Sequence, residues 1–253
     1  MTISKNLMNI LIALGLAVFI TMFASMGYNS TGGATGTGIN HRLFVLLGGN
    51  ITGGGYIQFL TYFAFFWSLF DIFEKRRLIK WEEKSIKKKY LPTNEKHLLM
   101  ANDLRELQFK MSDLEKENKA SMLTQMIKKA CVKFRTTASI PEVIEIISIQ
   151  TEINKDKSES SQSNIRYLTW VIPSIGFIGT VLGISQALMI ANSGDMNLIT
   201  ATLGVAFDTT LISLILSIVI MWFFHNLQEE TDNLHAGIRE YVIENLVNRI
   251  EIS

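Results

Sequence analysis

The fold is decided by the stretch YLTWVIPSIGFIGTVLGISQALMIA (Tyr167–Ala191), which is followed after six residues by LITATLGVAFDTTLISLILSIVIMWFF (Leu198–Phe224). Apart from Asp208, neither stretch contains a charged residue, and each exceeds the roughly 20 residues that a helix needs to cross a bilayer core. Lipid offers the backbone no hydrogen bonds, so both stretches must be helical. Together they predict an antiparallel pair of membrane helices.

Two further apolar stretches precede this pair, at Asn6–Met26 and Gly54–Phe73. The first stands where a cleaved signal peptide would stand. However, only Lys5 precedes it as a basic residue, and its apolar run exceeds the roughly 7–15 residues of a signal core, so we expect a retained span. The sequence therefore predicts an all-α integral membrane protein with four transmembrane helices and long cytoplasmic helical extensions.

The basic residues predict the orientation. Segment 74–166 holds 20 of the 24 Lys and Arg residues, whereas loop 27–53 holds only Arg42 and loop 192–197 holds none. Because basic loops stay on the cytoplasmic side, we expect this segment and both termini in the cytoplasm, and the two loops outside. Anionic lipid could also bind these basic clusters. Topology accounts for them without a lipid site, and we favour that interpretation.

These spans divide the chain into four expected parts: an N-terminal pair of transmembrane helices with a flexible Gly-rich external loop at 27–53 (1–74), a cytoplasmic helical domain (75–166), the two pore-type helices quoted above (167–225) and a cytoplasmic C-terminal helix (226–253). Within the cytoplasmic domain, apolar stripes predict helices over 94–135 and 141–153. The Ser-rich stretch 154–164 reads as a linker.

Nothing in the sequence indicates an enzyme. The single cysteine, Cys131, excludes an internal disulfide and a cysteine zinc cluster. The four histidines lack metal-ligand spacing, and no nucleophile or phosphate-binding motif occurs. The 24 basic and 23 acidic residues nearly balance, so no nucleic-acid partner is expected. We therefore expect no cofactor and no resident metal.

The last two spans each carry a stripe of small and hydroxyl-bearing residues: Gly176, Thr180, Gly183 and Ala187 in one, and Thr202, Ala206, Thr210, Ser213 and Ser217 in the other. At about 1.5 Å per residue, Thr180 and Thr210 both lie roughly 17 Å from the outer surface. Hydroxyls matched in depth indicate a polar cavity or ion path. Small residues also allow close helix packing, and the pattern fits both interpretations equally well.

Asp208 is an acidic residue deep in the fourth span. An ionised carboxylate at that depth costs at least a few kcal/mol, which makes it a functional candidate. Two residues separate it from Thr210, so at about 100° per residue it points about 200° away. We expect it to be protonated or bonded to a polar group on another helix.

Two motifs in these spans resemble those of a known family. Pro173–Ile184, PSIGFIGTVLGI, resembles the PxxGLLGTVxGI signature of the MotA/TolQ/ExbB proton channel family, and Ala206–Leu214, AFDTTLISL, resembles its ALxTTxxGL segment. Thr180 and Thr210 align with the family's two threonines. The chain departs from the pattern at Ser213, where the family usually has Gly, and at Asp208, where it often has an apolar or small residue.

The resemblance implies a motor subunit of the bacterial inner membrane. Members form pentamers around a dimer of an ExbD/TolR/MotB-like partner, whose single span carries an aspartate, and ion flow rotates one against the other. The load stays open among flagellar rotation, outer-membrane transport, gliding, adhesin control and defence. The alternative is a non-conducting membrane scaffold or sensor whose small and hydroxyl residues serve helix packing.

The resemblance also implies an ion pathway along the last two spans, with five candidate residues: Thr180, Thr209, Thr210, Ser213 and Asp208. The transported ion is a proton or sodium. A proton needs one titratable carboxylate and water, and we take it as the default. Sodium needs several oxygens, which the hydroxyls of Thr180, Thr209 and Thr210 could supply together with backbone carbonyls and a partner carboxylate.

Overall fold

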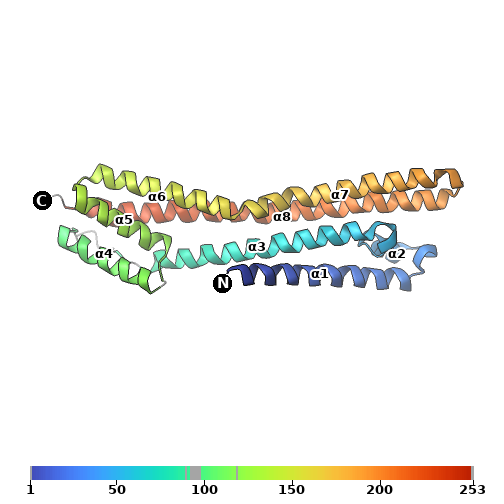
Figure 1. The fold of residues 1–253 in the computed structure, drawn as a ribbon, viewed down its shortest axis with the longest axis horizontal. Coiled ribbons are helices and arrows are strands. Elements are labelled where there is room, and N and C mark those ends of the chain that lie inside the picture. Colours follow the sequence, from blue (N-terminus) through green and yellow to red (C-terminus); the bar gives the residue numbers. More distant parts are fainter. Residues whose placement is uncertain (1, 89, 92–97, 118, 252–253) are drawn as a thin grey trace. The chain divides into compact units, whose positions relative to one another are not determined.

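The computed structural model describes residues 2–88, 90–91, 98–117 and 119–251, which are almost entirely helical (Figure 1). Helices make up 88% of the structure, and the described residues contain no strand. Four helices in this part of the chain are long and apolar enough to cross a membrane. The expected all-α class with four transmembrane helices is therefore confirmed.

The chain forms two units, each built from two separate segments. The first unit contains Met1–Glu74 and Ser163–His225, and the second contains Lys75–Gln162 and Asn226–Ser253. Two helices run through both: α3 (Tyr56–Lys87) and α8 (Met196–Asn245). Their N-terminal parts belong to the first unit and their C-terminal parts to the second.

The first unit contains the apolar helices. Helix α1 (Thr2–Ser30) lies beside α3, and α7 (Ser163–Ile190) lies beside α8 (Figure 1). Small residues let α1 pack closely, because Ala13, Ala17 and Ala24 are fully buried. Large apolar side chains on α1, α7 and α8 point outward instead, as expected of helices that face lipid or other subunits.

The segment between α1 and α3, called the external segment after its predicted side of the membrane, contains regular structure where the sequence predicted a flexible loop. It contains a 3-10 turn (Gly33–Thr35), the helix α2 (Ile39–Leu46) and a wide turn (Ile51–Gly55). Gly54 adopts a φ of 132°, which residues with a side chain rarely adopt, and the chain turns there into α3. Contacts with α3, described below, hold α2 in place.

The second unit contains α4 (Ala101–Lys116), α5 (Met122–Thr137), α6 (Ile140–Ser161) and the C-terminal parts of α3 and α8. Its core is apolar and includes Leu104, Met111, Leu123, Ile127, Val143, Ile147, Ile238 and Val242. The chain end is tied in by backbone hydrogen bonds, from Leu99 N to Arg249 O (2.7 Å) and from Glu251 N to Leu99 O (3.1 Å).

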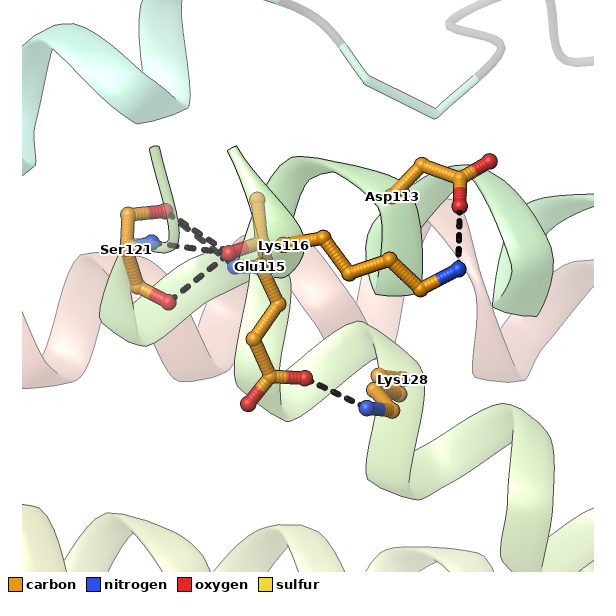
Figure 2. A network of polar contacts seen from close by, with 6 residues as sticks. Asp113, Glu115, Lys116, Ser121 and Lys128 are labelled. Carbon is orange, nitrogen blue, oxygen red and sulfur yellow. Dashed lines mark hydrogen bonds and ion pairs between the residues drawn. The ribbon is translucent and has the colours of Figure 1, made fainter. Parts of the chain in front are cut away.

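The predicted single helix over 94–135 is wrong, because the structure has two helices there; residues 94–97 and 118 lie outside the described part. Ser121 begins α5 with a reciprocal cap, in which Thr124 N donates to Ser121 Oγ (3.2 Å) and Ser121 N donates to Thr124 Oγ1 (2.8 Å). Ion pairs join Lys128 to Glu115 across the break and Lys116 to Asp113 within α4 (Figure 2). A cap of this kind starts a new helix.

The predicted linker over 154–164 is also wrong. Helix α6 continues to Ser161, Gln162 caps its end and α7 starts one residue later. Three polar contacts hold this stretch against α8: Ser158 with His235 (3.0 Å), Gln162 with Thr231 (2.9 Å) and Lys155 with Asp232 (3.3 Å). Its polar side chains thus form an interface with another helix, although a polar, Ser-rich composition alone predicts a loop. Helix α8 itself ends at Asn245 and is followed by a 3-10 turn, Val247–Arg249.

Candidate functional site

Helices α7 and α8 meet along a seam without bulky side chains, formed by Gly176, Gly179 and Gly183 on α7 and Ala206, Thr209 and Ser213 on α8. A Cβ atom placed on any of the three glycines would overlap its partner across the seam. A Cβ at Gly179 would also come within 2.8 Å of Ile57 on α3. The α7 stripe therefore allows close helix packing.

Thr180 and Thr210, which the sequence placed at the same depth, meet at this seam. Their hydroxyl groups are hydrogen-bonded to each other. Thr210 Oγ1 also donates to the carbonyl oxygen of Gly176 (2.9 Å), and Thr180 Oγ1 lies 3.2 Å from the carbonyl oxygen of Ala206. Both side chains are half-buried, so the pair stays accessible at an edge of the seam.

Thr209 and Ser213 lie deeper, with exposed fractions of 1% and 0%. Thr209 donates to the carbonyl oxygen of Ala206 (2.7 Å), and Ser213 donates to that of Thr210 (2.9 Å). Both hydroxyls are thus satisfied by their own helix while they fill the space left by the glycines. The three threonine hydroxyls gather around only two carbonyl groups, those of Gly176 and Ala206.

Asp208 points to a different neighbour. Its side chain is 3% exposed and forms a two-pronged ion pair with Arg42 of α2. The bond between Arg42 Nη2 and Asp208 Oδ1 measures 2.7 Å. Our sequence reasoning missed Arg42 as a partner. The sequence held one signal of this pairing: Arg42 is the only basic residue of loop 27–53, and Asp208 is the only acidic residue of the last span.

Arg42 of this ion pair borders a cavity of about 740 Å³, called the outer cavity because it lies on the side predicted to be external. One wall comes from the external segment, with His41, Arg42 and Asn50, and the other comes from the first turns of α8, with Asn197 and Thr202. The cavity reaches Val205 but is not lined by Thr180 or Thr210. The structure therefore separates the polar outer cavity from the threonine pair.

The described residues contain no group of three His, Cys, Asp or Glu side chains that could hold a metal ion. Two sets of polar groups lie at or beside the seam: the seam hydroxyls with their two carbonyls, and the Asp208 carboxylate paired with Arg42. The first set offers oxygens alone, and the second is a matched pair of charges.

The fold and site define a multi-pass helical membrane protein in which two spans meet over hydrogen-bonded threonines. The family described as the MotA/TolQ/ExbB proton channel family matches residues 112–240, just over half of the chain. The chain therefore belongs to this family, as its motifs predicted. No curated protein and no solved structure gives a significant match.

Proposed function

We propose that this chain is the ring-forming subunit of an ion-driven motor in the bacterial inner membrane. Five copies surround two copies of an ExbD/TolR/MotB-like protein, whose single span carries an aspartate. Ion flow past that aspartate turns the two parts against each other and drives work in the cell envelope. Family membership and the meeting of Thr180 with Thr210 support this proposal.

The threonine pair carries the proposal. Both hydroxyls donate or share their protons within the seam, which leaves oxygen lone pairs to accept from a protonated partner carboxyl or from water. They are half-buried, whereas Thr209 and Ser213 are closed off behind them. Thr180 and Thr210 therefore contact the ion route, while Thr209 and Ser213 keep the two helices close.

The proton stays our default ion, with sodium as the second candidate. The convergence of three hydroxyls on the carbonyls of Gly176 and Ala206 favours sodium, because hard cations prefer several oxygen ligands. A proton needs no such cluster. A partner carboxylate would complete either route.

The decisive experiment replaces Thr180 or Thr210 by Val, which keeps the size and removes the hydroxyl. The chain and its single-span partner are reconstituted in vesicles, and ion uptake is measured with sodium varied at fixed membrane potential and pH. We expect uptake to fall by about tenfold or more, since a desolvated ion loses a charge-stabilising oxygen. Ser174→Ala is the control, because Ser174 is exposed on α7 and its hydroxyl donates to the carbonyl oxygen of Trp170 in its own helix.

Full uptake in both Val variants at normal expression would contradict the role of Thr180 and Thr210 in the ion route. Absence of uptake by the unmodified chain with its partner would contradict the motor proposal and favour the non-conducting scaffold, which the buried positions of Thr209 and Ser213 also fit. Uptake that requires sodium, and that weakens its sodium response in Thr209→Ala, would replace the proton by sodium. Sodium-independent uptake that a protonophore abolishes would keep the proton.

A further inference from the structure

The external helix α2 is fastened to all three helices around it. Phe44 packs edge-on against Phe23 of α1, with ring centres 6.2 Å apart. On α3, Gln58 Nε2 donates to the carbonyl oxygen of Leu46 (3.2 Å) and Tyr62 Oη donates to that of Leu47 (3.3 Å). The contact with α8 is the ion pair of Arg42 with Asp208. Of these contacts, only the ion pair joins the external segment to a helix of the seam.

We propose that Arg42 and Asp208 form an anchor that holds α2 against α8 and so fixes the outer end of the ion route. Arg42 is then a positioning residue, and Asp208 is its attachment point rather than an ion carrier. The functional part of this inference rests on the proposed motor function. The anchoring itself does not, and it can be measured without ion flow.

The location of Asp208 on α8 supports an anchor. It is two residues before Thr210, so it lies about 200° around the helix from the threonine pair. The seam holds one side of α8 through the glycines of α7, and Arg42 holds the opposite side. These two contacts together restrict how α8 can rotate, which keeps Thr210 facing Thr180.

The two side chains of the ion pair also differ in how far they are buried. The Asp208 side chain is 3% exposed, whereas that of Arg42 is 57% exposed and borders the outer cavity. Removing Arg42 would leave a buried carboxylate without a partner, which is strongly unfavourable. Removing the carboxylate would leave an arginine that water already reaches. Loss of Arg42 should therefore do more harm than loss of the Asp208 charge.

This asymmetry gives a test with four variants: Arg42→Gln, Arg42→Lys, Asp208→Asn and the double variant Arg42→Gln/Asp208→Asn. Three quantities are measured: the folded yield in detergent, hydrogen exchange of the α2 amides and ion uptake in vesicles. Asn40→Ala is the control, because Asn40 lies exposed on the same helix. All four variants are compared with the unmodified chain and its single-span partner.

We expect Arg42→Gln to give the lowest folded yield, about threefold or more below Asp208→Asn. The double variant should return to the yield of Asp208→Asn, because no buried charge is then left alone. Arg42→Lys should lie between Arg42→Gln and the unmodified chain, since an ammonium keeps the charge but loses the two-pronged geometry. Exchange at α2 should rise about tenfold or more in Arg42→Gln, Asp208→Asn and the double variant.

Uptake should follow the yield order, with Asp208→Asn and the double variant reduced but active. Two results would overturn the anchor. One is a double variant that yields no more than Arg42→Gln; the other is an Asp208→Asn variant without uptake but with α2 exchange unchanged, which would make Asp208 an ion carrier. If instead the unmodified chain with its partner shows no ion uptake, the motor proposal fails, and the folded yield and the hydrogen exchange of α2 still test the anchor.

Discussion

Four hydroxyl-bearing side chains gather where α7 meets α8, and their burial separates them into two kinds. Thr209 and Ser213 are closed in and bonded to their own helix, so they pack. Thr180 and Thr210 are half-buried and bonded to each other, so they can also receive a ligand. The seam can therefore combine helix packing, by Thr209 and Ser213, with ion contact, by Thr180 and Thr210.

Cys131 is fully buried in α5, and burial raises the pKa of its thiol to about 12. Only the thiolate reacts with alkylating reagents, and at pH 8 a shift of this size leaves about a thousandfold less thiolate than in an exposed cysteine. We expect no measurable alkylation of the folded chain by iodoacetamide at pH 8, and full alkylation in denaturant, as followed by mass spectrometry. Rapid alkylation of the folded chain would show that this core is open.

Residue spacing predicted the matched depth of Thr180 and Thr210, because two antiparallel helices with a short connection place equal rises at equal depth. The hydrogen bond between the two hydroxyls was not predicted and comes from the structure. It did not predict the partner of Asp208, since Arg42 stands 166 residues away and no periodicity relates a loop residue to a helix. Spacing also predicted the angular offset of Asp208 from Thr210. Long-range ion pairs need the fold before they can be assigned.

At the scale of elements, apolar length predicted all four spans, because a lipid core permits only helices there. Polar segments were harder. The stretch 154–164 is helical because its side chains bond to α8, and the external segment is ordered because α2 bonds to α3. A composition rich in Ser or Gly is compatible with either a loop or a helix, and tertiary contacts decide which of the two the segment forms.

The short connection between α4 and α5 offers a test of the proposed topology. Lys119 is well exposed, with 65% of its side chain accessible, so Lys119→Cys should react with a membrane-permeant maleimide and resist an impermeant one in intact cells. Thr37→Cys, exposed on the external segment, should react with both reagents. Labelling of Lys119→Cys by the impermeant reagent would reverse the orientation.

The neighbouring Ser121 is unsuitable for this purpose, because it is 2% exposed and caps α5. A cysteine placed there would be hidden from reagents on either side of the membrane. It would also remove a cap worth about 1 kcal/mol of stability.

For the whole molecule, the large apolar side chains on the outer faces of α7 and α8 require a covering of lipid or other subunits. We expect native mass spectrometry of the detergent-purified complex to give five copies of this 28.6 kDa chain with two copies of a single-span partner. A stable monomer or dimer would count against the motor. Purification of the chain without its partner is the control for subunit number.

Gly176 and Ser213 have a consequence for how sequences in this family can vary together. A Cβ atom at Gly176 would collide with the hydroxyl of Ser213, so the two positions share one small volume. Gly176→Ala alone should disrupt the packing of α7 against α8. Gly176→Ala with Ser213→Gly should preserve this packing, since the added methyl then occupies the space that the serine leaves. In an alignment of relatives, we expect covariation: serine at the second position should occur with glycine at the first, and alanine at the first only with glycine at the second.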